Sequence, residues 1–245
     1  MRLKPNIPMA IQASNVLRQQ LRKKRFPDNR LPSEHTIAAD LGISRGTVRQ
    51  ALAILEQEGI IIRHQGSGTF VNPHVLQIDA RVDVAYEFSE LIEAAGFTPT
   101  IDTVEVKRLP ADAEVAQQLA VAVGAPLLVI HKVFLASGQP TIFVMERIPV
   151  ALIRESYEDN ELHNPIFTFL QERCQVEVDY ILSAIIPSLV EGDLVARLGV
   201  AAGQTCLQFN EVFYSPSNQP LAQATVFFRD PIIRFHALRK MSQMR

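Results

Sequence analysis

The sequence predicts an α+β protein in two parts: a helical N-terminal part that ends in a β-hairpin, and a C-terminal part built on a mostly antiparallel sheet with flanking helices. Apolar residues at helical spacing predominate in the first sixty residues, whereas the remainder contains pairs of strand-like runs joined by turn residues. The charge divides at the same place. Residues 1–75 hold 11 Lys and Arg against 5 Asp and Glu, and residues 76–245 hold 13 against 21. The net charge of −2 therefore conceals a basic N-terminal part, which points to a nucleic-acid contact there.

The composition excludes several classes of protein. With 245 residues, 47% of them hydrophobic and 20% charged, the chain is neither disordered nor fibrous. Its longest apolar run, Leu119–Ile130, is interrupted by Gly124 and Pro126 and is too short to cross a bilayer. The N-terminus has no secretion signal, so we expect a cytoplasmic protein without a membrane contact. Cys174 and Cys206 stand far apart without a metal-ligand spacing, so no metal or cofactor is expected.

The first expected helix covers about residues 9–25. Its apolar residues recur at three- and four-residue steps, which gives one buried stripe: Ala10, Ala13, Leu17 and Leu21. The run 22–25 is entirely basic, and a basic helix end is favourable beside the helix dipole whether it is merely solvated or contacts a ligand. Pro27 ends the helix.

Two further helices are expected in close succession. Ser33 can cap the first of them, Glu34 lies in its first turn, and Gly42 suits its left-handed exit. Ser44 can then cap a third helix that runs to about Glu58. Two short helices joined by such a turn form a helix-turn-helix.

The third helix has an exposed N-terminal turn with the chemistry of a groove reader. Its inward stripe is apolar: Val48, Ala51, Leu52 and Leu55. Arg45, Arg49 and Gln50 point away from that stripe, and Thr47 lies at its margin. Arginine can bind both acceptors of guanine, and a hydroxyl can bind a phosphate or a base edge. The alternative is an ordinary surface helix whose arginines pair with acids, although the first acid on this helix is Glu56.

A β-hairpin is expected directly after this helix. Its strands, about residues 60–64 and 69–71, flank a turn that contains Gly66 and Gly68, so its backbone can approach a groove closely. The turn lacks the pattern of a nucleotide-binding loop. His64 has two equal interpretations, a DNA contact or a cover for the strand.

These residues together resemble the winged helix-turn-helix domain of GntR-type bacterial transcription regulators. The resemblance rests on the following motifs: Leu31-Pro32-Ser33-Glu34, Leu41-Gly42-Ile43-Ser44-Arg45, Thr47-Val48-Arg49-Gln50-Ala51-Leu52, Glu58-Gly59 and Gln65-Gly66-Ser67-Gly68-Thr69-Phe70-Val71. It implies that operator DNA is contacted by Ser33, Glu34, Arg45, Thr47, Arg49, Gly66 and Gly68. Ser44, Gln50 and His64 complete the candidate DNA-binding set, and for Glu34 the opening of the helix is an equally good role.

The boundaries follow from a change of pattern. Residues 1–73 form the expected DNA-binding domain, residues 74–82 a linker without a helical stripe, and residues 83–245 a domain for effector binding and dimerisation. In that last domain the patterns predict helices and strands in this order: helix 83–95, strand 101–109, helix 111–123, strands 127–135 and 141–149, helix 165–174, an extended run 176–186, helix 189–198, strands 207–214 and 221–229, and strand 232–238.

The C-terminal part contains an internal echo and a second resemblance. A helix, a glycine turn, a strand and a Gln-Pro turn span residues 119–140, and a similar series spans residues 198–220. Together with Phe88-Ser89-Glu90 and residues 229–235, this series resembles the effector domain (UTRA) of the HutC branch of GntR regulators, whose fold is similar to chorismate lyase. The resemblance implies an effector site at Ser89, Lys132, Glu146, Phe167, Gln223 and Arg229.

This sequence departs from the sugar-phosphate binders of that branch. Glu87 stands where they tend to have a hydroxyl, and Phe134 stands where they have a second arginine. An added acid and a lost cation disfavour a phosphate, so we expect a smaller or less anionic effector. Equally, Ser89 and Lys132 can be polar residues without any ligand.

The sequence thus predicts a metabolite-responsive repressor that binds a palindromic operator in double-stranded DNA as a homodimer. No catalytic residues are expected, because the histidines lack metal-ligand spacing and the serines lack a nucleophile elbow. Two alternatives remain at this point. One is a DNA-tethered enzyme of chorismate-lyase type, and the other is a dimeric DNA-binding protein without an effector.

Overall fold

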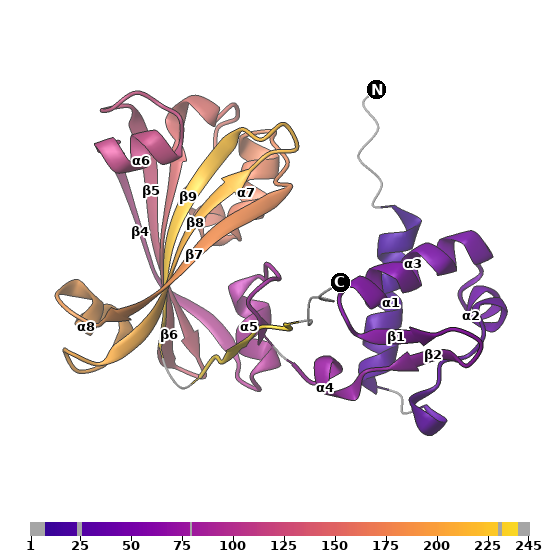
Figure 1. The fold of residues 1–245 in the computed structure, drawn as a ribbon. Helices are drawn as coiled ribbons and strands as arrows, with labels where there is room; N and C mark the ends of the chain where they lie inside the picture. Colours follow the sequence, from indigo (N-terminus) through magenta and orange to yellow (C-terminus); the bar gives the residue numbers. More distant parts are fainter. Residues whose placement is uncertain (1–7, 24–25, 79, 230–231, 240–245) are drawn as a thin grey trace, which may run out of the picture. The chain divides into compact units, whose positions relative to one another are not determined.

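The computed structural model describes residues 8–23, 26–78, 80–229 and 232–239, without the side chains of residues 103 and 104. Contacts within the chain divide it into two compact units (Figure 1). The first takes its residues from 1–81 and 236–245, and the second consists of residues 82–235. Within the described part of the chain, no helix is both long and apolar enough to cross a membrane.

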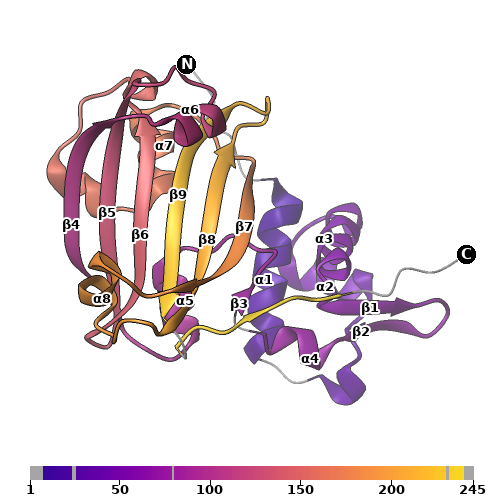
Figure 2. The same ribbon diagram turned by 60° about the vertical axis from the view of Figure 1, so that its left-hand side comes forward.

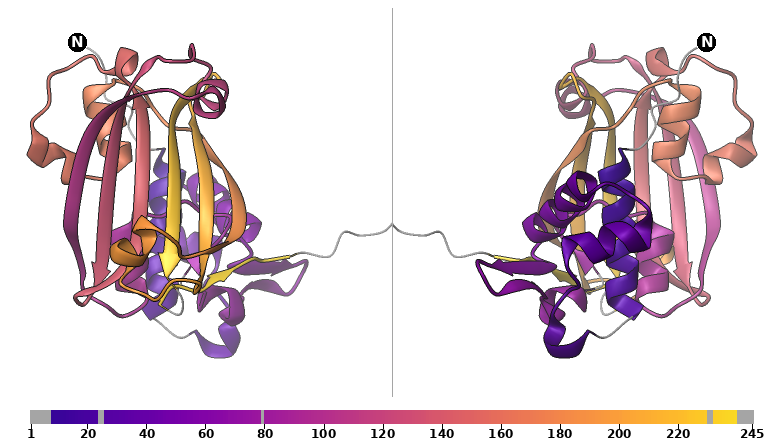
Figure 3. Two further views of the ribbon diagram at one scale, coloured as in Figure 1. Left: turned by 90° about the vertical axis from the view of Figure 1, so that its left-hand side faces the viewer. Right: turned by 90° about the vertical axis from the view of Figure 1, so that its right-hand side faces the viewer.

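The first unit is a winged helix-turn-helix, as the sequence predicts. Its elements are α1 (Met9–Lys23), a 3-10 turn (Pro27–Asn29), α2 (Glu34–Leu41), α3 (Arg45–Gln57), β1 (Ile61–His64), β2 (Gly68–Val71), α4 (Pro73–Leu76) and β3 (Ala80–Arg81). The three long helices group together, and the hairpin β1–β2 projects beside them (Figure 3). The short helix α4 begins at Pro73, the last residue of the predicted DNA-binding domain, and continues into the predicted linker; proline's fixed backbone suits its first turn.

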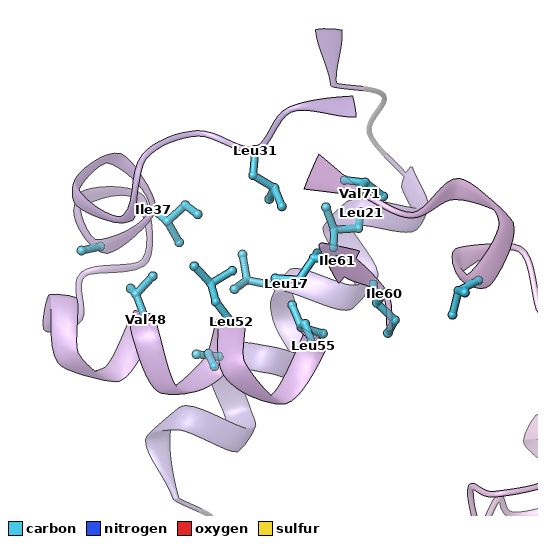
Figure 4. Close-up of a cluster of buried hydrophobic side chains, with 14 residues drawn as sticks. Leu17, Leu21, Leu31, Ile37, Val48, Leu52, Leu55, Ile60, Ile61 and Val71 are labelled. Atoms are coloured by element: carbon cyan, nitrogen blue, oxygen red, sulfur yellow. The ribbon is translucent and has the colours of Figure 1, made fainter. Parts of the chain in front are cut away.

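One hydrophobic core holds the three helices and the hairpin together (Figure 4). The predicted stripes of α1 and α3 supply most of it, with Leu17 and Leu21 from α1 and Leu52 and Leu55 from α3. Ile61 of β1 closes the core. Each of these side chains is at most 4% exposed, so truncating one would cost roughly 2–5 kcal/mol. The orientation of α3 is thereby fixed, and with it the face that it leaves to solvent.

The second unit is built on one antiparallel sheet of six strands. Its elements are α5 (Phe88–Ala94), β4 (Pro99–Pro110), α6 (Ala113–Gln118), β5 (Pro126–Ala136), β6 (Gln139–Pro149), 3-10 turns at Val150–Leu152 and Asp159–His163, α7 (Ile166–Arg173), β7 (Tyr180–Leu189), α8 (Asp193–Leu198), β8 (Thr205–Tyr214) and β9 (Pro220–Arg229). The short strand β10 (Phe235–His236) falls at the boundary between the two units in the sequence. The strand order is β4-β5-β6-β9-β8-β7 (Figure 2). A strand, a helix and a hairpin thus occur twice, and the two series meet where β6 pairs with β9.

The two faces of this sheet carry different helices. The buried side of α6 packs with Leu127 and Val129, and that of α8 with Val133 and Phe143. The alternate residues of the strands point to the other face, where Phe88 of α5 meets Phe134 and Phe167 of α7 meets Phe213. This second face forms the cavity described below.

Several predicted elements begin or end elsewhere. The predicted helix 83–95 is helical only from Phe88, and the predicted helix 111–123 ends at Gln118. The predicted strand 176–186 is observed at Tyr180–Leu189, so the next helix starts later than predicted. The reason is tertiary: β7 pairs with β8 along ten residues from Tyr180 to Leu189, and this pairing extends the strand into a sequence with helical character.

Candidate nucleic-acid interface and ligand cavity

The N-terminal turn of α3 combines a structural cap with exposed polar side chains. Ser44 Oγ accepts a hydrogen bond from the backbone N–H of Thr47 at 3.1 Å, and the two hydroxyls lie 2.8 Å apart. Arg45, Arg49 and Gln50 are exposed. Arg45 has no hydrogen bond or ion pair with any described residue, so its five N–H donors are available to a ligand. The cap shows that Ser44 and Thr47 have a structural role in addition to any DNA contact.

Arg49 differs from Arg45 because it has an acidic neighbour. Its Nη2 lies 3.3 Å from Oε2 of Glu34, which belongs to α2. The alternative in which an arginine of this helix pairs with an acid therefore applies to Arg49. The sequence of α3 alone does not reveal this pair, because the acid comes from the preceding helix. An exposed pair of this kind stabilises the fold by at most about 1 kcal/mol, and it can open to release Arg49.

Ser33 has the same capping role at the start of α2. Its Oγ accepts the backbone N–H of Thr36 at 3.1 Å, and the two hydroxyls lie 2.9 Å apart. Glu34 then occupies the first helical turn, where a carboxylate interacts favourably with the helix dipole. Ser33 and Glu34 thus open α2, and Glu34 also reaches Arg49.

Two arginines that the sequence did not single out connect the wing to the rest of this surface. Arg63 of β1 donates from Nη2 to the carbonyl of Arg49 at 3.3 Å, and its Nε lies 3.2 Å from Glu56. Arg30 is exposed, and its Nε lies 3.0 Å from the position that a Cβ on Gly68 would occupy. No sequence pattern marks Arg30, because only the bridge between residues 30 and 70 brings it to the wing.

The wing turn needs its glycines. Gly66 has a φ of +78° and Gly68 a φ of +120°, and both values disfavour residues with a Cβ. His64 is exposed, and its ring meets Phe70 edge-on at 5.5 Å. That contact is compatible with both interpretations of His64, since an exposed ring can cover a strand and still reach DNA.

The second unit contains a cavity of about 550 Å³, within the range of small-molecule sites. Four predicted effector residues line it, and they come from four elements: Ser89 of α5, Lys132 of β5, Glu146 of β6 and Phe167 of α7. The structure thus assembles residues that are up to 78 positions apart in the sequence into one site.

A buried ion pair lies on the wall of this cavity. Lys132 Nζ is 3.0 Å from Glu146 Oε2 and donates to the carbonyl of Asn164 at 2.8 Å, and both side chains are almost fully buried. Despite this proximity, Glu146 Oε2 has no hydrogen bond with a described partner. Each charge of the pair compensates the other, so Lys132 is not a free cation.

Gln223 and Arg229, the other two predicted effector residues, do not line the cavity. Both are odd-numbered residues of β9, and side chains alternate between the two faces of a strand. Gln223 accepts a hydrogen bond from Arg147 at 2.6 Å, and Arg229 donates to the carbonyl of Pro140 at 3.2 Å. Their even-numbered neighbours Ala224 and Phe228 line the cavity in their place.

The cavity also includes four carboxyl groups outside the predicted set, and two of them, Glu87 and Glu211, have raised pKa values. Burial, with the nearby Glu90 and Glu146, raises the pKa of Glu87 to about 7, against a smaller opposing effect of Lys132. Burial likewise raises the pKa of Glu211, although its carboxylate accepts a hydrogen bond from Ser183 at 2.9 Å. Glu211 lies in an alternating strand, but only the pairing of β8 with β7 and β9 shows which face it occupies.

Comparison with known proteins gives two family matches. The UTRA domain matches residues 94–230, and the domain of bacterial regulatory proteins, gntR family, matches residues 11–71. The HTH-type transcriptional repressor NagR of Bacillus subtilis (strain 168) is 26% identical over 238 residues, or 96% of this chain and 97% of NagR. The HTH-type transcriptional regulator Rv0792c of Mycobacterium tuberculosis (strain ATCC 25618 / H37Rv) is 26% identical over 234 residues, or 92% of this chain and 83% of that protein.

A solved structure shares the fold over nearly the whole chain. The possible transcriptional regulator YydK from Bacillus subtilis subsp. subtilis str. 168 superposes with a TM-score of 0.78 at 17% identity, covering 96% of this chain and all of that one. At this identity the likeness establishes the fold alone.

Proposed function

The chain belongs to the UTRA-containing bacterial regulatory proteins of the gntR family, and from this membership we propose that it is a homodimeric repressor of the HutC branch. It is a DNA-binding transcription regulator with a domain for a small-molecule effector. We assign DNA binding to residues 1–73, the connection to residues 74–82, and effector binding and dimerisation to residues 83–245. Its relatives are transcription regulators, which supports a sensor in place of an enzyme. We place its action in the cytoplasm, where bacterial DNA lies.

The exposed turn of α3 is the observation that supports the DNA contact most strongly. Arg45 and Gln50 project from this turn without a competing acid, and Arg49 projects beside them with only an exposed partner. The wing carries glycines at its tip and Arg30 next to them. A helix of this kind enters a major groove, while the wing lies on the flanking backbone or minor groove.

The two edges of the sheet support dimerisation through β7. The edge strand β4 carries charged residues (Asp102, Glu105, Lys107 and Arg108), whereas β7 carries none. Five apolar side chains of β7 are at least 39% exposed, and they are Tyr180, Leu182, Ile185, Ile186 and Leu189. A long apolar edge strand that stays exposed to solvent favours aggregation. We therefore infer that β7 of a second copy, or the sheet edge of that copy, covers β7 in a homodimer.

A homodimer accounts for a palindromic operator and for ligand control. Two copies related by a twofold axis present two α3 helices to successive major grooves. An effector in the cavity changes operator affinity only if it binds the DNA-competent arrangement and the other arrangement unequally, and the effect is then reciprocal.

Selection from a random duplex library tests the proposal. The full chain is expected to enrich a palindrome with half-sites about one helical turn apart. Fluorescence anisotropy with the enriched duplex then compares the wild type with Arg45→Ala and with Glu93→Gln, an exposed acid of the other unit. Arg45→Ala is expected to raise the Kd about tenfold or more while Glu93→Gln leaves it unchanged. Enrichment of no sequence, or equal affinity of all three proteins, would overturn the DNA-reading role.

A further inference from the structure

The cavity of the second unit has an acidic lining. Five carboxyl groups line it, and one lysine is the only Lys or Arg among its described lining residues. Two of the acids, Asp83 and Asp179, are exposed at its margin together with His163. The other three, Glu87, Glu146 and Glu211, are at least partly buried. A site with this balance attracts cations and repels anions.

The one lysine does not supply a charge for an anionic ligand. Lys132 is paired with Glu146 at 3.0 Å and also donates to the backbone of Asn164. A phosphate or carboxylate that recruited Lys132 would leave Glu146, which is 2% exposed, as an unpaired buried charge. Breaking a buried pair in this way is strongly unfavourable.

Glu87 and Glu211, by contrast, have no cationic partner within ion-pair distance among the described residues. The contact of Glu211 is a hydrogen bond from the hydroxyl of Ser183. Glu87 precedes α5 and makes no side-chain cap, so its carboxylate is not occupied by the helix N-terminus. A partly buried carboxylate without a cation either takes up a proton or is stabilised by a positive charge from a ligand.

Aromatic rings form much of the remaining wall. Phe88 meets Phe134 edge-on at 5.2 Å and Phe228 at 6.1 Å, and Phe209 meets Phe228 at 5.0 Å. All four line the cavity. The faces of aromatic rings are electron-rich, and rings combined with carboxylates are how proteins bind organic ammonium groups.

We propose that the effector site takes an organic ammonium compound, with its cationic nitrogen near Glu87 and Glu211 and its apolar body against the phenylalanine wall. This inference rests on the proposed role of the cavity as the effector site. It goes beyond that role because it fixes the sign of the ligand's charge. A cavity of about 550 Å³ accommodates a small metabolite of this class.

Binding of such a cation is coupled to proton release. Glu87 faces Glu90 on its own helix, Glu146 on β6 and Lys132 on β5, and its pKa is about 7 without ligand. Glu211 faces Ser183 on β7, and its pKa is also raised. An ammonium group favours both ionised carboxylates, so its affinity increases as the pH rises through 7.

Calorimetric titration of the full-length protein with a charge series tests the inference. The probes share one ring and differ in charge: phenethylamine and phenyltrimethylammonium are cations, 2-phenylethanol is neutral, and phenylacetate and phenyl phosphate are anions. The cations are expected to bind at least about tenfold more tightly than the alcohol, and the anions more weakly still. Glu87→Gln and Glu211→Gln are each expected to reduce the cation's affinity about tenfold and to weaken its pH dependence, whereas Glu93→Gln on the same helix leaves both unchanged.

The outcomes separate this inference from the proposed function. Tighter binding of the anions or the alcohol than of the cations would overturn the ammonium assignment, and so would equal affinity of the wild type and the Gln variants for the cations. If the anions or the alcohol release the protein from the selected operator, its role as a sensor is still supported. If no probe binds, the ammonium assignment fails as well. Operator binding by the same samples then shows whether the DNA-reading role is intact.

Discussion

The guanidinium of Arg49 on α3 lies 3.3 Å from the carboxylate of Glu34 on α2. A candidate DNA-binding residue is therefore paired with the residue that opens the preceding helix. Both side chains keep some exposure, at 63% for Arg49 and 28% for Glu34, so the pair is weak and DNA can replace it. We propose that Glu34 acts as a positioning residue that restricts where Arg49 can reach.

The first prediction separates these two roles. Arg49→Ala is expected to weaken binding to the selected operator by about 1–3 kcal/mol per half-site, because a bidentate contact with guanine is lost. Glu34→Gln is expected to change the affinity by less than about 1 kcal/mol and to relax discrimination among bases. The reason is that Arg49 keeps its charge but loses the ion pair that restricts its orientation. Anisotropy titrations with the operator and with single-base variants measure both effects. Unchanged affinity of Arg49→Ala would remove Arg49 from the interface.

The second prediction concerns the wing. Gly68→Ala places a Cβ 3.0 Å from Arg30 Nε at a φ of +120°, whereas Gly66→Ala at +78° meets nothing within 4 Å. Gly68→Ala is therefore expected to lower the free energy of unfolding by about 1–3 kcal/mol and to displace Arg30. Gly66→Ala, the matched control, carries only the left-handed backbone penalty of about 1–2 kcal/mol. Urea unfolding of both variants checks this order, and a Gly66→Ala variant that is the less stable of the two would refute it.

The third prediction follows from the pKa of Glu87, which burial and neighbouring acids raise from 4.5 to about 7. Between these two pH values the folded protein keeps a proton that the unfolded chain has lost. The contribution of Glu87 to stability therefore falls as the pH rises from about 4.5 to about 7 and is constant above that. Glu87→Gln removes this slope, so the variant is expected to gain stability over the wild type as the pH rises.

Thermal unfolding across this pH range measures the effect. Glu93→Gln, an exposed position on the same helix, is the control and should run parallel to the wild type. A Glu87→Gln curve that also stays parallel would show that Glu87 is not buried as the structure places it.

The fourth prediction concerns the sheet edges. Leu189 on β7 is 50% exposed and Leu109 on β4 is 45% exposed, so the two positions are matched in residue type and exposure. If β7 is the dimer edge, Leu189→Glu is expected to raise the dimer dissociation constant at least about tenfold, because a charge must lose its water. Leu109→Glu leaves it unchanged. Light scattering during size-exclusion chromatography distinguishes the two, and monomers formed only by Leu109→Glu would move the interface to β4.

The sequence was most informative about the helix-turn-helix. Its caps, its glycine exits and its apolar stripes are local signals, because capping and periodicity act within a few residues. Ser33, Ser44 and the stripe of α3 are therefore found where the pattern predicts them. The same reasoning missed Arg30 and the acid opposite Arg49, since both come from elements that are close only in space.

Which residues line the cavity depends on the tertiary structure. Ser89, Lys132, Glu146 and Phe167 were predicted and line it, while Gln223 and Arg229 were predicted and lie elsewhere. A strand's alternation places Gln223 and Ala224 on opposite faces, but it does not say which face holds the ligand. Likewise, only the paired strands reveal that Glu211 joins Glu87 around the same cavity.

By itself, the sequence determined the two-part organisation, the winged helix-turn-helix and the basic charge of the N-terminal part, because those features depend on short-range periodicity, capping and charge. The tertiary structure decided which face of the six-stranded sheet forms the cavity and which of its charged residues form an ion pair. The reason is physical: the ionisation of a carboxyl group depends on its burial and its neighbours in space. Glu146 and Glu87 are both acids in the sequence, but the fold pairs Glu146 with Lys132 at 3.0 Å, whereas no described Lys or Arg lies within ion-pair distance of Glu87.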